Sequence, residues 1–267
     1  MSVYDIYGNE IVVGGDSSAQ AKLTVKRNNE TLVTDFLTVA QSYLGQTDIV
    51  YKDGDTIFYK KTATNGIDCS TYVGLCLMGY SYNETPYVTQ QYIDPSAWVE
   101  NSSAHNWAIP TIKYKVSRYI DGHDSDETIH LACQIARWMS ERNQVVPLTN
   151  GFRDVQPGDI VFWGHKVSGT DEWVHPDWFM HINHVGIILT KEDAPNTYVD
   201  KNGVTRDWDK SKYPFKHGII DVGISTPPCR TTHWLEEGQE DPTNVYSNDV
   251  NSVQIICRPD LGAMDGD

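Results

Sequence analysis

Apolar residues recur at helical spacing in two segments of the chain. The first stripe consists of Val33, Phe36, Leu37, Ala40, Tyr43 and Leu44, and the second consists of Ala132, Ile135, Ala136 and Met139. Gly45 supplies a stop signal after the first stripe, and Asp124 with Glu127 has the spacing of a capping box ahead of the second. The pattern therefore predicts one helix in each segment.

A third segment, residues 72–78, is apolar nearly all round, which indicates a buried helix. It follows Asp68-Cys69-Ser70 after one intervening residue, and Asp68 or Ser70 can cap the helix. A helix N-terminus favours negative charge, so we expect it to lower the pKa of the Cys69 thiol and to populate the nucleophilic thiolate. Cys69 is therefore a candidate nucleophile, with a buried structural cysteine as the alternative.

Strand-like runs dominate the second half of the chain. Pro157-Gly158 is a turn signal that leads into the first of them, and His184 opens the second. The runs lie at residues 160–163, 184–189, 219–224 and 253–257, with the last expected at a sheet edge. Together with the helices, they predict an α+β fold.

A cysteine at a helix start facing a histidine on a sheet is the papain-like arrangement, in which the imidazole takes the thiol proton. The chain resembles the NlpC-type family of papain-like cell-wall cysteine peptidases. The hallmarks of that family are an Asp-Cys-Ser helix start, a Leu-x-Pro-Gly-Asp-Leu-Val-Phe turn and strand, and a His-Val-Gly-Ile strand. All three occur here in order, at residues 68–70, 155–162 and 184–187, with Val155 and Ile160 in place of the leucines. The resemblance covers roughly residues 34–225.

The resemblance implies a papain-like α+β fold, in which the cysteine helix packs on an antiparallel sheet that carries the histidine. One peptidase domain would span residues 31–267, with insertions at 80–124 and 165–182, and residues 1–30 would form an N-terminal arm or hairpin. The insertion at 80–124 is rich in tyrosine and tryptophan. It is expected either to line a cleft that stacks on sugar or peptide, or to pack beneath a long loop.

The resemblance also implies amide hydrolysis, with Cys69 as the nucleophile and His184 as the base that later protonates the leaving amine. In the family, a polar residue on the next strand orients the catalytic histidine, and Asp221 falls where that residue should be. His217 and Asp200 are the competing candidates for this third position.

Further residues are expected to support the substrate or the oxyanion. Backbone N–H groups at the start of the cysteine helix would form the oxyanion hole, with Asp68 and Ser70 beside them. Asp68 is expected to cap and orient the helix rather than to react. Tyr51 is the nearest match to the active-site tyrosine of the family, with Tyr59 as the reserve.

The composition limits the classes of ligand. The 267 residues are 39% hydrophobic, enough for one sizeable core, and the net charge of -15 argues against a nucleic-acid partner because phosphate binding relies on Lys and Arg. The five cysteines form no C-x-x-C pair. His175, His181 and His184 invite a zinc hypothesis, but the last two are three residues apart and would point to opposite faces of one strand. Neither a metal nor an organic cofactor is expected.

By resemblance, the substrate is a peptide bond in the stem peptides of peptidoglycan, and the predicted function is that of an endopeptidase. One alternative is an N-acetylmuramoyl-L-alanine amidase or a related acyltransferase with the same residues; another is a non-catalytic phage structural or wall-binding protein. Residues 1–10 lack the features of a signal peptide, and no apolar run has the length of a membrane span. We therefore expect action on the bacterial cell wall after delivery by a virion or release by lysis, with the oligomeric state left open.

Overall fold

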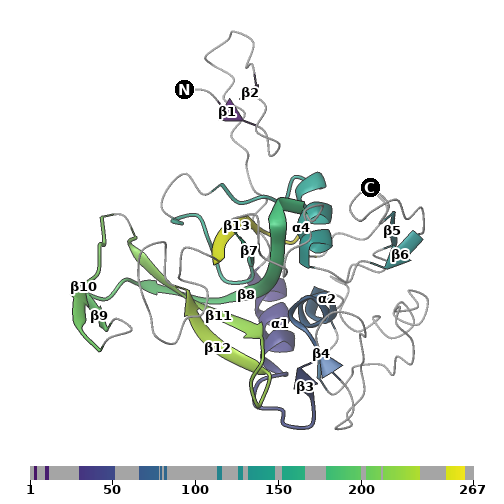
Figure 1. Cartoon of the computed structure of the whole chain (residues 1–267), viewed down its shortest axis with the longest axis horizontal. Coiled ribbons are helices and arrows are strands. Elements are labelled where there is room, and N and C mark those ends of the chain that lie inside the picture. Colours follow the sequence, from purple (N-terminus) through teal and green to yellow (C-terminus); the bar gives the residue numbers. More distant parts are fainter. Residues whose placement is uncertain are drawn as a thin grey trace.

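Within the described residues, the chain folds as an α+β protein, with three helices packed on a five-stranded antiparallel sheet (Figure 1). This confirms the α+β part of the predicted fold class. The computed structural model describes residues 3–4, 10–11, 30–51, 66–77, 79, 81–82, 113–115, 126–128, 132–147, 152–165, 179–199, 203–211, 213–234 and 251–261. The predicted arm at 1–30 and the insertions at 80–124 and 165–182 lie largely outside these ranges, so their boundaries stay predictions.

The central sheet has the strand order β12-β11-β8-β7-β13, and every neighbouring pair is antiparallel. Its strands are β7 (Ile160–His165), β8 (Ile182–Asp193), β11 (Phe215–Val222), β12 (Cys229–Trp234) and β13 (Asn251–Cys257). The predicted runs at 160–163 and 184–189 fall within β7 and β8, and the run at 219–224 overlaps the neighbouring strand β11, which ends at Val222. The run at 253–257 lies in the edge strand β13, as predicted.

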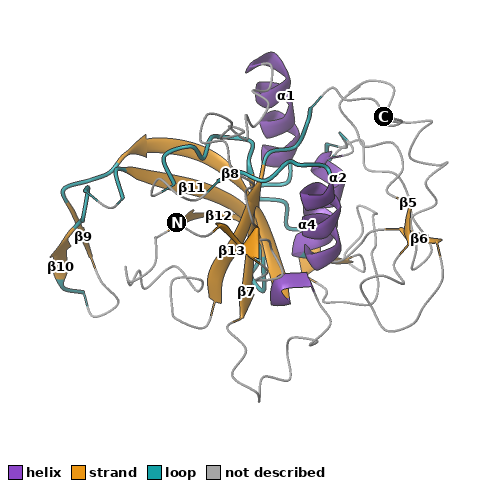
Figure 2. Cartoon of the chain, turned by 90° about the horizontal axis from the view of Figure 1, so that it is seen from above, coloured by secondary structure: helices purple, strands orange, loops and turns teal. Residues whose placement is uncertain are grey.

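The three helices lie together on one side of this sheet (Figure 2). They are α1 (Glu30–Gln41), α2 (Cys69–Leu77) and α4 (Ala132–Glu141). The chain turns after α1 at Gly45, whose φ of +74° lies in the left-handed region that glycine adopts without strain. All nine residues of α2 are buried, which confirms the prediction of a helix enclosed by protein.

The predicted start of α4 is wrong. The helix begins at Ala132, whereas Glu127 lies in the short strand β6 (Asp126–Thr128), which pairs with β5 (Lys113–Lys115). Asp124, the other half of the expected capping box, lies outside the described residues. Glu127 takes part in the β5–β6 pairing and therefore precedes the helix. The apolar stripe that starts at Ala132 is buried, and it marks the helix correctly.

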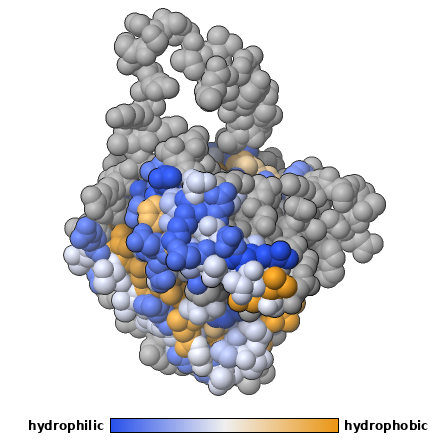
Figure 3. All heavy atoms as spheres, turned by 90° about the vertical axis from the view of Figure 1, so that its left-hand side faces the viewer, coloured by the Kyte–Doolittle hydropathy of each residue, from blue (hydrophilic) through white to orange (hydrophobic). Residues whose placement is uncertain are grey.

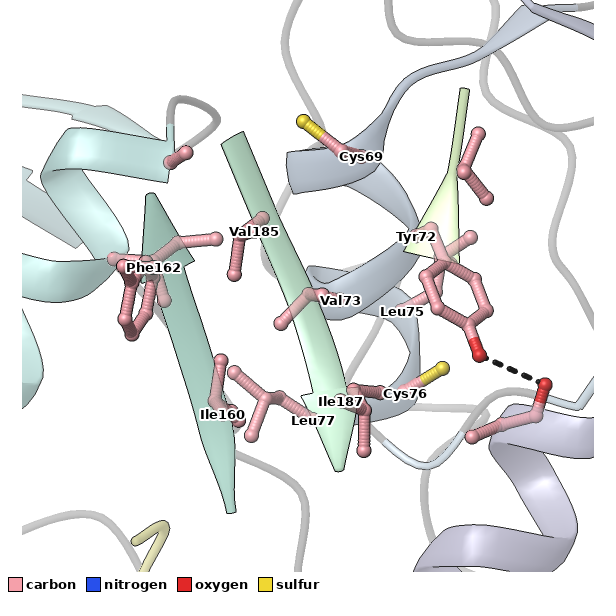
Figure 4. Packing of buried hydrophobic residues seen from close by; sticks show 14 of the residues in the cluster. Cys69, Tyr72, Val73, Leu75, Cys76, Leu77, Ile160, Phe162, Val185 and Ile187 are labelled. Carbon is pink, nitrogen blue, oxygen red and sulfur yellow. Dashed lines mark hydrogen bonds between the residues drawn. The ribbon is translucent and has the colours of Figure 1, made fainter. Parts of the chain in front are cut away.

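Both faces of the sheet are covered, and β8 shows the alternation between them. Val185 and Ile187 belong to the core cluster that includes the helices, and Figure 4 shows them beside α2. Ile188 packs instead with Val161 and Ile219 in a second cluster. Because strands covered on both faces are apolar at nearly every position, they appear in the sequence as continuous hydrophobic runs.

The Pro157-Gly158-Asp159 turn ties the helices to the sheet. Gly158 has a φ of +90°, and a Cβ there would lie 3.1 Å from Cγ1 of Val33 on α1. The Gly158 N–H donates to the Ile188 carbonyl at 2.8 Å, and Oδ2 of Asp159 accepts the Gln156 N–H at 2.7 Å. These contacts give the motif a structural role.

The remaining elements are short. They are β1 (Val3–Tyr4), β2 (Glu10–Ile11), β3 (Val50–Tyr51), β4 (Gly66–Ile67), β9 (Thr197–Val199), β10 (Thr205–Asp207) and the 3-10 turn η3 (Phe179–His181). In the aromatic insertion, Tyr82 packs edge-on against Tyr43 in the main core at a ring distance of 6.0 Å, and the other aromatic residues of that insertion lie largely outside the described residues, so its role stays a prediction.

The side of the molecule that carries β9 and β10 is a mixed surface. Its hydrophobic areas are separated by hydrophilic ones (Figure 3), and the exposed apolar side chains of the β9–β10 region include Val199 and Val204. Scattered apolar side chains of this kind are ordinary on protein surfaces. None of the helices in the described part of the chain has the length and apolar character needed to cross a bilayer.

Candidate active site

The start of α2 is built by a side-chain cap. Oδ1 of Asp68 accepts the Thr71 N–H at 2.7 Å and the Ser70 hydroxyl at 3.0 Å. Asp68, and not Ser70, is therefore the N-cap, because it satisfies a backbone donor that the helix leaves without a partner. Just before the cap, Ile67 pairs with Tyr51 through the parallel strands β3 and β4, which places Tyr51 near the helix start.

Cys69 lies in the first turn of α2 and is 7% exposed, more than any other cysteine of the chain. Its sulfur points toward the end of the sheet at which β8 begins (Figure 4). The backbone amides of Val185 and Ser70 hydrogen-bond the sulfur and favour a lower thiol pKa. Since Val185 directly follows His184, the thiol lies beside the segment of β8 that carries His184.

The electrostatics of Cys69 contradict one expectation. Burial raises the pKa of the thiol well above its ordinary value, the charges of Asp68 and Asp221 raise it further, and the two backbone amides only partly offset this. The predicted lowering by the helix N-terminus is wrong because desolvation and the capping carboxylate outweigh it. The resting group at neutral pH is therefore a thiol, which needs a base before it can attack.

His184 and Asp221 form a buried pair on adjacent strands. Nε2 of His184 lies 2.9 Å from Oδ2 of Asp221, and the two side chains are 10% and 1% exposed. The imidazole also packs against the Trp163 ring at a centroid distance of 5.3 Å. The structure thus brings together the predicted base and the favoured third residue.

Gly186 makes this pairing possible. It lies opposite Asp221 in the β8–β11 ladder. A Cβ at Gly186 would meet Cγ2 of Ile219 at 2.9 Å and the Ile220 carbonyl oxygen at 3.1 Å. Since real Cβ atoms essentially never come this close, the glycine of the His-Val-Gly-Ile stretch lets β11 approach.

Asp221 is held in its ionised form. Burial raises the pKa of its carboxyl, but hydrogen bonds and charges from His184 and Arg230 outweigh burial, and the pKa lies below its ordinary value. An ionised carboxylate only accepts hydrogen bonds, so Nε2 of His184 must carry the proton. Nδ1 is then the basic nitrogen of the neutral ring.

The other candidates for the third position lie elsewhere. His217 is completely buried on β11, where it is paired with Lys191 in the ladder. Asp200 and Tyr59 lie outside the described residues. The structure therefore places Asp221, and not His217, beside His184.

Arg230 is a residue of this site that sequence analysis missed. Its Nε donates to Oδ1 of Asp221 at 3.1 Å. The sequence feature that could have identified Arg230 is the turn from Gly223 to Pro228. This turn joins β11 and β12 into a hairpin in which Arg230 lies opposite Asp221. Because turn length sets hairpin register, this pair was within reach of sequence reasoning.

The described residues contain no group of three or more His, Cys, Asp or Glu side chains that could hold a metal ion. His181 lies in η3, just before the strand that carries His184, and His175 is outside the described ranges. What the site does contain is a thiol, an imidazole and a carboxylate near one end of the sheet, which are the groups of a nucleophile, a base and an orienting acid. Comparisons of the chain with protein-family models, with curated proteins and with solved structures found no match.

Proposed function

We propose that this protein is a papain-like, cysteine-dependent amide hydrolase that cleaves peptide bonds in the stem peptides of peptidoglycan. The observation that carries the proposal is the buried His184–Asp221 pair. His184 directly precedes Val185, whose backbone amide contacts the Cys69 sulfur at the capped start of α2. The substrate class rests on the sequence resemblance to the NlpC-type family and on its three motifs.

In the proposed reaction, Nδ1 of His184 takes the thiol proton while the Cys69 sulfur attacks the carbonyl carbon. Proton transfer and attack occur together, because the raised pKa of the thiol disfavours a standing thiolate. The imidazolium is stabilised by the Asp221 carboxylate and then protonates the leaving amine. Water, activated by the same imidazole, hydrolyses the thioester and restores the thiol.

The oxyanion that forms in each step needs donors at the start of α2. The backbone N–H groups of the first helical turn are the candidate donors, and each such donor is worth about 3 kcal/mol in comparable sites. Asp68 already occupies the Thr71 N–H, and the Ser70 N–H contacts the Cys69 sulfur, so the Cys69 N–H is the proposed donor in this turn. Asp68 fixes the position of this turn without entering the chemistry.

The test is digestion of purified peptidoglycan, followed by mass spectrometry of the new termini. Wild-type protein should release fragments cut within the stem peptide, and Cys69→Ala and His184→Ala should each lower the rate by at least about 10³-fold. The double variant should lose little more, because nucleophile and base act as one unit. Cys133→Ala, which alters a cysteine buried in α4, is the matched control and should keep its activity.

The outcomes separate the competing functions. Cleavage between the sugar and L-alanine would assign an amidase with the same residues instead of an endopeptidase. Wall binding without any release of fragments would assign a non-catalytic wall-binding protein. Full activity in Cys69→Ala would refute the nucleophile outright.

A further inference from the structure

Asp221 has a second partner besides the histidine. In the β11–β12 hairpin, Arg230 is the residue directly opposite Asp221. Its Nε donates to Oδ1 at 3.1 Å and its Nη2 to Oδ2 at 3.4 Å, so the guanidinium fork spans both carboxylate oxygens. A bidentate contact of this kind fixes the plane of a carboxylate as well as its charge.

The backbone leaves room for this arginine. Gly223 follows Asp221 by two residues, and a Cβ there would lie 3.0 Å from Nη2 and 3.2 Å from Cζ of Arg230. The guanidinium therefore lies directly against the glycine backbone. A Cβ at position 223 would require the guanidinium to shift by a few tenths of an ångström.

We propose that Arg230 is a positioning residue for the amide hydrolysis, which holds the Asp221 carboxylate ionised and oriented so that Asp221 can fix the His184 tautomer. This inference rests on the proposed function for its catalytic consequence. The arrangement of Arg230, Asp221 and His184 is itself a property of the fold that can be measured without a substrate.

The physical need for Arg230 follows from the burial of Asp221, which is 1% exposed. A buried carboxylate without a cation becomes protonated at higher pH, because desolvation disfavours its charge. The charged and titratable groups that act on it are His184 from β8 and Arg230 from β12. Its own charge acts on the thiols of Cys69 on α2 and of Cys229, the first residue of β12.

The test compares Arg230→Gln and Arg230→Lys with Arg258→Gln. Arg258 is a matched control because it also pairs with a buried aspartate, binding Asp159 at 2.7 Å, and Asp159 is likewise 1% exposed. Two measurements are made across pH 4–9 on the full-length protein: the ¹⁵N spectrum of the histidine rings, which reports tautomer and protonation, and the pH profile of kcat/KM on purified peptidoglycan. Thermal denaturation shows that each variant is folded.

In Arg230→Gln, we expect the His184–Asp221 pair to take up its proton about 1–3 pH units higher than in the wild type, with the Nε2–H tautomer lost over the same range. The acid limb of kcat/KM should move upward with it, and Arg230→Lys should restore part of the shift. Arg258→Gln should lower stability without moving either curve.

Equal effects of Arg230→Gln and Arg258→Gln on both curves would overturn the proposal, as would an unchanged histidine spectrum in Arg230→Gln. If Arg230→Gln does not fold, Arg230→Lys provides the test. A histidine ¹⁵N spectrum and a pH profile of kcat/KM equal to those of the wild type would then reject a role for the guanidinium fork. If the wild type has no hydrolytic activity, the proposed function fails, while the spectra still establish or reject the positioning of His184 by Arg230.

Discussion

Asp68 performs two functions at the start of α2, and two substitutions separate them. Its Oδ1 caps the helix through the Thr71 N–H, while its negative charge raises the pKa of the Cys69 thiol. Asp68→Asn retains a capping oxygen but removes the charge. Asp68→Ala removes both.

The magnitudes follow from these contacts. Removing the charge from the helix N-terminus should cost Asp68→Asn about 0.3–1 kcal/mol of stability. Asp68→Ala should lose about 1 kcal/mol more, because the Thr71 N–H loses its acceptor. In both variants, the loss of a neighbouring negative charge should lower the pKa of the Cys69 thiol. A lower pKa gives more thiolate at a fixed pH below the pKa, but a less basic thiolate is a weaker nucleophile, so the reaction rate should rise by less than the thiolate fraction does.

The assay follows the reaction of Cys69 with a small disulfide reagent between pH 6 and 10, with mass spectrometry to locate the modified cysteine and urea denaturation to measure stability. Glu141→Gln, which removes a carboxylate near the end of α4, is the control and should leave the rate unchanged. A Cys69 rate in Asp68→Asn equal to or below that of the wild type would refute the electrostatic reasoning. Equal stability of the Asn and Ala variants would refute the capping role.

Two further predictions concern packing around the site. Gly186→Ala should destabilise the fold by about 1–3 kcal/mol and weaken the proposed hydrolysis, because the new Cβ meets Ile219 and the backbone of Ile220 and pushes β11 from β8. Urea denaturation measures the stability and wall digestion measures the activity. A variant as stable as the wild type would contradict the close approach of β11 to β8 at Gly186. Tyr72→Phe should lower the free energy of unfolding by about 1 kcal/mol in the same assay, because it removes the hydroxyl that donates to the Ala40 carbonyl at 2.9 Å and links α2 to α1 (Figure 4). An unchanged urea midpoint would show that this hydrogen bond does not stabilise the packing of α2 on α1.

The sequence by itself determined the features that depend on residues close in the chain. The cap at Asp68, the turn at Gly158 and the apolar runs that became β7 and β8 each follow from neighbouring residues, and each is present in the structure. The start of α4 was predicted wrongly for the same reason, since a local pattern of Asp124 and Glu127 says nothing about the strand that pairs with Glu127.

Tertiary structure alone decided which residue pairs with His184 and whether the Cys69 sulfur rests as a thiol or as a thiolate. His217 and Asp221 lie on the same strand, and an irregularity in the β8–β11 ladder between Gly218 and Ile219 changes the register between them. Sequence alternation cannot locate such a bulge, and a shift of one residue turns a side chain to the other face. The raised pKa of Cys69 likewise depends on burial by elements distant in sequence, because desolvation is a property of the packed site and not of the helix start that carries the thiol.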